Sequence, residues 1–197
     1  MLRGVYQSAT ILAVVIVFYM VDFWLIRRYD PLRAQGSSRS WSYTIMVMVA
    51  AVFVIAQPIA WPWLGLYTSA WWGLLVQAVG LTLNLGALAL HWWARVHLGQ
   101  FYGEREEVQP GQYLVESGPY AHVRHPIYTS YFTLASGLLL INPALPTLLV
   151  AIYAFLDFLQ ATRREEKLLI ENLPGYPGYM DRIPRFLLRV RKHSGDR

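Results

Sequence analysis

Apolar residues along this chain gather in five long runs that polar stretches separate. A run of about 20 apolar residues can cross the ~30 Å hydrocarbon core of a bilayer as a helix, whereas a soluble domain shows shorter amphipathic elements. We therefore predict an all-α integral membrane protein with about five transmembrane helices. They cover roughly residues 5–26, 41–60, 69–93, 127–141 and 146–162.

The last two runs are short, and the sequence NPALP at 142–146 separates them. Two prolines within five residues break a helix, so we predict a helical hairpin followed by a cytoplasmic C-terminal extension. One long kinked helix is the alternative. We expect a single membrane-embedded domain over 1–197, in which 1–99 holds three spans and 100–197 holds a loop, the hairpin and the tail.

The basic residues indicate how the segments alternate across the membrane. All but Arg3 of the 17 lysines and arginines lie between the first and second runs, between the third and fourth, or after the fifth. Basic loops stay in the cytoplasm, so we expect the N-terminus outside and the C-terminus inside. The net charge of +5 then requires no nucleic-acid partner, because anionic lipid headgroups also attract a basic tail.

Metal chemistry is not expected. The sequence has no cysteine, which excludes disulfides and thiolate metal sites. His91 and His97 are six residues apart, a spacing that does not suit a pair of metal ligands on one helix face.

The stretch GPYAHVRHPIYTSYF at 118–132 places charged residues directly before an apolar run. Pro126 suits the first turn of a helix, so His125 lies near the N-cap and Arg124 just outside it. A helix N-terminus carries free N–H groups and a partial positive charge, and an arginine beside it favours a carboxylate or phosphate ligand. The alternative is that Arg124 extends to the lipid headgroups.

A second polar cluster, ATRREEKLL at 161–169, begins where the fifth run ends. Two adjacent carboxylates cannot share one helix face, so at most one of them points into a common site. Glu165 could accept hydrogen bonds from an amine or from ribose hydroxyls. A solvated run of charges is the alternative.

Some polar residues fall inside the apolar runs. An ionisable group there usually has a partner or lines a polar cavity. We expect Asp22 to form an interfacial ion pair near Arg27. For Asp157, a hydrogen bond between helices and a place in a cavity wall both stay open. Three further polar residues are expected to join helices by hydrogen bonds, namely Gln77, Thr82 and Asn84.

Together these features resemble the isoprenylcysteine carboxyl methyltransferase family and its wider group of membrane methyltransferases, which includes phospholipid N-methyltransferases. The resemblance covers about the last 85 residues. It is carried by LVESGPY at 114–120, VRHPIY at 123–128, the pair Glu165 and Glu166 with Leu169, Tyr176, Tyr179, and PRF at 184–186.

The resemblance implies that S-adenosylmethionine binds on the cytoplasmic side. The implied cofactor-binding residues are Gln112, Tyr113, Leu114, Val115, Tyr120, His125, Pro126, Ile127, Tyr128 and Glu165. Many members carry an arginine that contacts the substrate one turn before the first glutamate, where this chain has Ala161. We expect Arg124 and Arg164 to act as catalytic residues in its place.

These expectations predict an S-adenosylmethionine-dependent methyltransferase that takes a lipophilic acceptor from the bilayer. Carboxyl O-methylation of a prenylcysteine-like group is the first prediction, because a carboxylate is already ionised at neutral pH and needs no general base. The alternatives are a phospholipid or small-thiol methyltransferase, an NADPH-dependent membrane enzyme similar to sterol reductases, and a non-catalytic lipid-binding protein.

Overall fold

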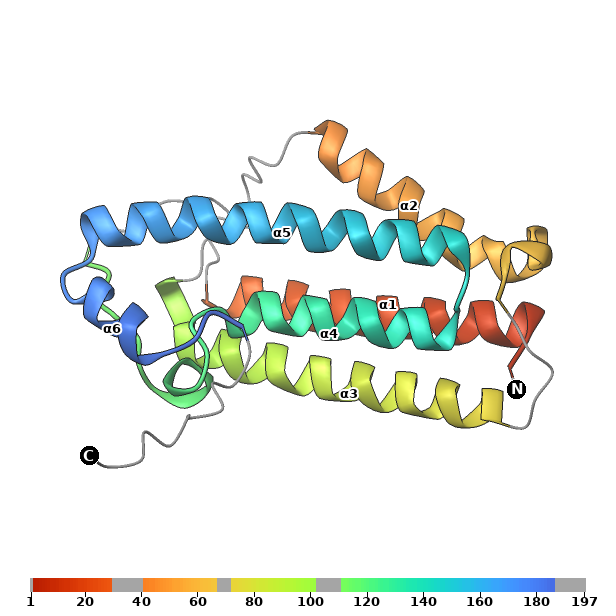
Figure 1. Cartoon of the computed structure of the whole chain (residues 1–197), viewed down its shortest axis with the longest axis horizontal. Coiled ribbons are helices and arrows are strands. Elements are labelled where there is room, and N and C mark those ends of the chain that lie inside the picture. Colours follow the sequence, from red (N-terminus) through yellow and green to blue (C-terminus); the bar gives the residue numbers. More distant parts are fainter. Residues whose placement is uncertain (1, 30–40, 67–71, 102–110, 187–197) are drawn as a thin grey trace, which may run out of the picture.

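The computed structural model describes residues 2–29, 41–66, 72–101 and 111–186, and this part of the chain is almost entirely helical. Five long helices form a bundle, and a short sixth helix covers one of its ends (Figure 1). The long helices are α1 (Gly4–Tyr29), α2 (Trp41–Ala60), α3 (Trp72–Leu98), α4 (Pro126–Ile141) and α5 (Leu145–Asn172). The short elements are α6 (Tyr176–Arg182) and the 3-10 helices η2 (Pro62–Leu64), η3 (Gly99–Phe101) and η4 (Gly118–Ala121).

The helices agree closely with the predicted segments, and the hairpin prediction is confirmed. α4 ends at Ile141 and α5 begins at Leu145, so the alternative of one kinked helix is wrong. α5 continues ten residues past the predicted end at Thr162, because no proline or glycine follows until Pro174. The beginning of the third predicted segment at 69–71 lies outside the described residues, as do the basic residues of 30–40, 102–110 and 187–197.

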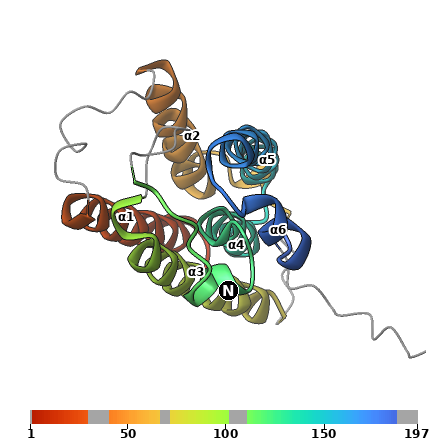
Figure 2. The ribbon, with the colours of Figure 1, turned by 90° about the vertical axis from the view of Figure 1, so that its left-hand side faces the viewer.

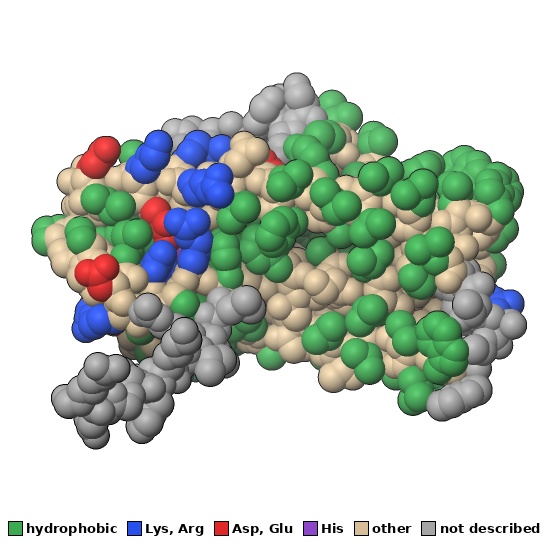
Figure 3. Space-filling model, viewed as in Figure 1, with side chains coloured by type: hydrophobic (Ala, Val, Ile, Leu, Met, Phe, Trp, Pro, Cys, Tyr) green, Lys and Arg blue, Asp and Glu red, His purple; other side chains and the backbone are tan. Residues whose placement is uncertain are grey.

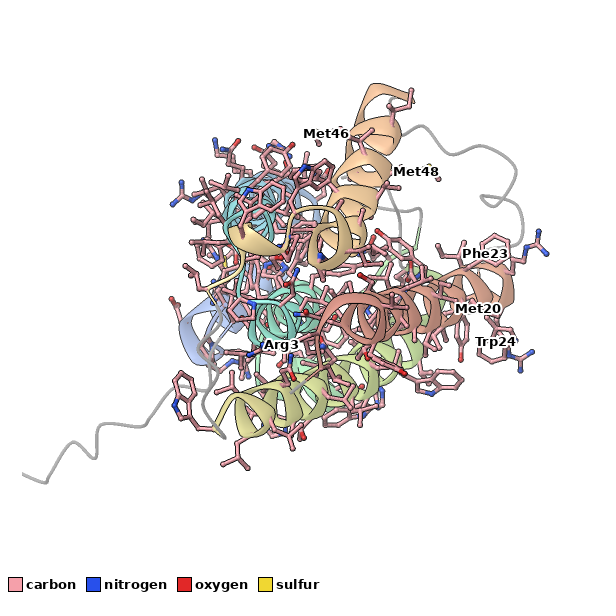
Figure 4. The ribbon with its side chains drawn as sticks, turned by 90° about the vertical axis from the view of Figure 1, so that its right-hand side faces the viewer. Arg3, Met20, Phe23, Trp24, Met46 and Met48 are labelled. Atoms are coloured by element: carbon pink, nitrogen blue, oxygen red, sulfur yellow. The ribbon has the colours of Figure 1, made fainter. Side chains whose placement is uncertain are left out.

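The composition of the helices fits an integral, multi-pass membrane protein. α1, α3 and α5 are long and apolar enough to cross a membrane, and residues 45–60 and α4 form shorter apolar helices. Large apolar side chains point outwards: Met20, Phe23 and Trp24 project from α1, and Met46 and Met48 from α2 (Figure 4). In Figure 3, apolar side chains spread over most of the visible face, whereas most of the visible Lys and Arg side chains gather at the α6 end.

α4 lies at the centre of the bundle, with α1, α3 and α5 around it (Figure 2). Its closest approach is to α3, where two glycines face each other. A Cβ added to Gly80 would lie 2.7 Å from the Gly137 carbonyl oxygen, and one added to Gly137 would lie 2.5 Å from Asn84 Oδ1. The backbones of α3 and α4 can therefore approach closely only because both positions lack a side chain.

Polar side chains join the helices at the end opposite α6. Gln7 Nε2 donates to the Ile141 carbonyl oxygen at 2.8 Å, and Gln77 Nε2 donates to the same oxygen at 3.2 Å. The predicted joining role of Gln77 is therefore confirmed. Thr82 differs, because its hydroxyl donates to the Ala78 carbonyl oxygen of its own helix. A threonine can satisfy its hydroxyl within the helix, so no partner on another helix was required.

Candidate active site

The ends of α3 and α5 and the start of α4 lie at the α6 end, which brings their polar residues together (Figure 1). η4 starts at Gly118 with a φ of +59°, which glycine adopts without steric cost. A Cβ there would also lie 2.3 Å from the His97 ring. α4 then begins at Pro126, directly after Arg124 and His125.

The segment 183–186 lies across the start of α4. The backbone N–H of Arg124 donates to the Pro184 carbonyl oxygen (2.9 Å), and that of His125 donates to the Arg185 carbonyl oxygen (3.1 Å). The rings of His125 and Phe186 pack with their centroids 6.0 Å apart. These two N–H groups ahead of the helix therefore bind the C-terminal extension and not an anionic ligand.

Glu166 is the acidic centre of a buried ionic cluster, the Glu166 cluster, which also contains Arg124, His125 and Arg185. Its Oε1 accepts from Arg124 Nη2 at 2.8 Å and lies 3.1 Å from His125 Nε2, and Arg185 donates to both of its oxygens. Glu166 is only 3% exposed and lies beyond the apolar part of α5. Burial alone would raise its pKa, but the hydrogen bonds from His125, Arg185 and Arg124 outweigh burial and lower the pKa to about 2.

Arg124 makes more hydrogen bonds within the protein than the sequence led us to expect. Its Nε and Nη2 donate to Glu166, and its Nη1 donates to the carbonyl oxygens of Met180 and Ile183. The Arg124 side chain is only 9% exposed. Its guanidinium is therefore not open to an anionic ligand, and the side chain does not extend to the lipid headgroups. Arg124 holds the C-terminal extension against α4, and a direct contact with an acceptor stays a prediction.

All of the predicted site residues line one cavity of about 880 Å³. Such a volume is typical of small-molecule sites. The residues that line it include Gln112, Tyr113, Leu114, Val115, Tyr120, Arg124, His125, Pro126, Ile127, Tyr128, Arg164 and Glu165. Their roles stay predictions, but the structure brings them to one place from three separate stretches of the chain.

The cavity has two chemically different parts. At the α6 end, the predicted residues form what we call the polar mouth. Deeper in the bundle, α1, α2, α4 and α5 enclose what we call the apolar chamber. It is lined mainly by residues such as Ile11, Val15, Val54, Leu138 and Val150. A cavity with a polar region next to an apolar region can bind a water-soluble molecule beside a lipophilic one.

The face of α5 towards the cavity could have been found from helical spacing. Asp157, Ala161, Arg164 and Leu168 line the cavity at steps of three or four residues, as one helix face requires. Glu165 also lines the cavity, whereas Glu166 points into its own cluster. The sequence interpretation did not include Tyr131 and Phe158, whose rings line the chamber and stack with centroids 5.1 Å apart.

Asp22 has a different partner from the predicted one. Its Oδ1 accepts from Arg95 Nη2 at 2.8 Å and lies 2.9 Å from His91 Nε2. Arg27 instead lies over the Phe23 ring, 4.3 Å from its centroid. Residues five apart on a helix do not share a face, which is why Arg27 is poorly placed for Asp22. For Asp157, the place in a cavity wall is confirmed.

The C-terminal extension closes the polar mouth through two buried tyrosines. Tyr176 and Tyr179 form an apolar cluster with Leu173, and Leu114 packs against it. The Tyr179 hydroxyl donates to the Tyr120 carbonyl oxygen at 2.6 Å. Burial raises the pKa of the Tyr179 hydroxyl well above its usual range, so this hydroxyl stays protonated and keeps donating.

The residues of the polar mouth fit the groups of S-adenosylmethionine. Glu165, with a side chain 35% exposed, can accept hydrogen bonds from an ammonium or from ribose hydroxyls. The side-chain amide of Gln112 can donate a hydrogen bond to a carboxylate. Leu114, Val115 and Tyr120 offer apolar surface for an adenine ring. The donors, acceptors and apolar surface that this cofactor needs are therefore all present in one cavity.

Residues 79–171 match the profile of the isoprenylcysteine carboxyl methyltransferase (ICMT) family. The chain is 29% identical over 129 residues to the cobalt-zinc-cadmium resistance protein CzcN of Cupriavidus metallidurans. It is 27% identical over 123 residues to the nickel-cobalt-cadmium resistance protein NccN of Alcaligenes xylosoxydans xylosoxydans. These matches cover 65% and 62% of this chain, and only 58% and 56% of the two relatives.

The fold matches that of a solved structure, the eukaryotic intramembrane Ras methyltransferase ICMT. The TM-score is 0.71 at 21% sequence identity, and the match covers 93% of this chain and 66% of the other. At that identity the comparison shows the shared fold.

Proposed function

We propose that this chain belongs to the isoprenylcysteine carboxyl methyltransferase family, whose profile residues 79–171 match, and that it is an integral membrane methyltransferase. It uses S-adenosylmethionine and methylates a lipophilic acceptor, first of all the carboxylate of a prenylcysteine-like group. The observation that carries the proposal is the cavity in which the polar mouth meets the apolar chamber.

The polar mouth would hold the cofactor on the cytoplasmic side. Glu165 would accept hydrogen bonds from its polar groups, and Leu114, Val115 and Tyr120 would pack against its adenine. When bound, the cofactor supplies an electrophilic methyl group on a sulfonium. The Glu166 cluster keeps α4, α5 and the C-terminal extension in fixed positions around it.

The acceptor would lie in the apolar chamber with its carboxylate towards the polar mouth. Holding two reactants in line can supply roughly 7–11 kcal/mol of the barrier, and an ionised carboxylate needs no base. Of the described residues that line the cavity, the cationic ones are Arg124 and Arg164. Because Arg124 is bonded within the Glu166 cluster, we assign the contact with the carboxylate to Arg164, which is exposed.

We further propose five membrane crossings, with the N-terminus outside and both the C-terminus and the polar mouth in the cytoplasm. The five apolar helices and the distribution of basic residues support this orientation. The acceptor would then enter sideways from the bilayer, and the cofactor would enter from the cytoplasm.

Binding titrations test the choice of cofactor. The protein is placed in phosphatidylcholine nanodiscs, and S-adenosylmethionine or NADPH is added in a calorimeter. We expect saturable binding of S-adenosylmethionine and none of NADPH. Binding of NADPH alone would favour a membrane reductase, and binding of neither would favour a non-catalytic lipid-binding protein.

A further inference from the structure

Two tyrosines of the C-terminal extension are equally buried but differ in their hydrogen bonds. Tyr176 is 3% exposed and Tyr179 is 2% exposed, and both line the cavity. The Tyr179 hydroxyl donates to the Tyr120 carbonyl oxygen. The Tyr176 hydroxyl is enclosed and has no hydrogen-bond partner within the described part of the chain. Tyr176 therefore requires an explanation that Tyr179 does not.

An apolar role alone does not account for the Tyr176 hydroxyl. The Tyr176 ring packs with Leu173 and Tyr179, and a phenylalanine would fill the same place without a polar group. A buried polar group without a partner is costly. Native structures usually supply the partner from the protein, from ordered water or from a ligand. For Tyr176, the remaining candidates are a water molecule and a molecule bound in the cavity.

The Tyr176 hydroxyl is a hydrogen-bond donor at physiological pH. Burial raises the pKa of this hydroxyl well above its usual range, and the charges of Glu166 and Glu165 raise it further. The phenol therefore stays protonated and can donate one hydrogen bond. A cofactor group that meets this hydroxyl must offer an acceptor.

The surroundings of Tyr176 indicate which half of the cofactor it meets. Leu114 packs against the apolar cluster that contains Tyr176, and Leu114 is also part of the surface assigned above to the adenine ring. Adenine carries ring nitrogens that accept hydrogen bonds, and the hydroxyls of ribose accept them as well. The adenosine half therefore brings acceptors to the side of the cavity where Tyr176 lies.

Building on the methyltransferase function proposed above, we infer that Tyr176 is a further cofactor-binding residue, whose hydroxyl donates a hydrogen bond to the adenosine half of S-adenosylmethionine. The C-terminal extension then does more than close the polar mouth, because it contributes a polar contact of its own to the bound cofactor. Tyr179 has the other role, since its hydroxyl joins the extension to Tyr120 within the fold.

Two tyrosine-to-phenylalanine variants separate a contact with the cofactor from a contribution to the fold. The wild type, Tyr176→Phe and Tyr179→Phe are placed in phosphatidylcholine nanodiscs, and thermal unfolding is measured without ligand. The affinity for S-adenosylmethionine is measured by calorimetry. The affinity for 5′-methylthioadenosine, which keeps the adenosine half and lacks the amino-acid half, is measured by competition against radiolabelled S-adenosylmethionine.

We expect Tyr176→Phe to keep or raise the melting temperature of the ligand-free protein, because it removes a hydroxyl that has no partner in the fold. Tyr179→Phe should lower the melting temperature, because the Tyr120 carbonyl oxygen loses its donor. Tyr176→Phe should weaken the binding of both ligands by the same factor, about 3- to 10-fold, as the loss of one neutral hydrogen bond does.

Four results would overturn the inference. Wild-type affinity of Tyr176→Phe for S-adenosylmethionine would assign the hydroxyl to an ordered water. A loss with S-adenosylmethionine alone would place the contact on the amino-acid half. No competition by 5′-methylthioadenosine against the wild type would leave the adenosine half without a site of its own. A Tyr176→Phe protein as destabilised as Tyr179→Phe would show that the hydroxyl has a partner within the fold.

The same measurements keep this inference separate from the proposed function. Each of the four results leaves the methyltransferase function intact, because the wild type still binds S-adenosylmethionine in all of them. A wild-type protein that binds no S-adenosylmethionine contradicts the proposed function and this inference together.

Discussion

Glu165 and Glu166 are neighbours in the sequence but lie in different surroundings. Glu165 lines the cavity, whereas Glu166 is buried among Arg124, His125 and Arg185. We therefore expect Glu165→Gln to weaken S-adenosylmethionine binding with only a small change in thermal stability, because its carboxylate is 35% exposed and its contact with His125 Nδ1 is long, at 3.8 Å. Glu166→Gln should lower the melting temperature, because removing one partner of a buried ionic cluster costs on the order of 3 kcal/mol.

Calorimetry and thermal unfolding in one detergent separate the two effects. A Glu166→Gln protein with wild-type stability would contradict the structural role of the cluster. A Glu165→Gln protein with wild-type cofactor affinity would remove Glu165 from the site.

The sequence spacing predicted that at most one of these two glutamates faces the cavity, because adjacent helical residues point about 100° apart, and the family resemblance indicated that it is Glu165. It did not predict the partner of Arg124. Glu166 lies 42 residues further along the chain, and only the packing of α5 and the C-terminal extension against α4 brings the two together. Local spacing carries no information on such a pair, and the same limit applies to Asp22 and Arg95.

At the scale of helices, α3 and α4 cross closely where Gly80 faces Gly137. An alanine at Gly80 would place its Cβ 2.7 Å from the Gly137 carbonyl oxygen and 2.9 Å from Leu140 Cβ. We expect Gly80→Ala to destabilise the protein by about 1–3 kcal/mol, as overpacking does. Gly86 on the same helix has nothing within 4 Å of an added Cβ, so Gly86→Ala is the matched control and should keep or raise stability.

Thermal unfolding of the two alanine variants decides this point. Equal stability of both variants would show that the crossing tolerates a side chain at Gly80.

The helices themselves were predictable, because long apolar runs and the two prolines mark their ends. The crossing of α3 and α4 was not predictable, because a glycine within an apolar run does not indicate which helix it will contact.

At the scale of the whole molecule, the fold joins a polar mouth at the α6 end to an apolar chamber between four helices. The elements that line the mouth include the residues before α4, the end of α5 and the C-terminal extension. Their assembly explains why the sequence signals were concentrated in the second half of the chain. The first half of the chain contributes α1 and α2, which line the apolar chamber and carry no comparable motif.

The most direct measurement of the central claim is the formation of a methyl ester. The protein in nanodiscs receives radiolabelled S-adenosylmethionine and S-farnesyl-N-acetylcysteine, and base-labile label on the acceptor is counted. We predict ester formation by the wild type and by Arg163→Ala, whose exposed side chain does not line the cavity. Arg164→Ala should lose on the order of 100-fold, because its acceptor is no longer held in line. No ester from the wild type, or equal activity in the two arginine variants, would contradict the account.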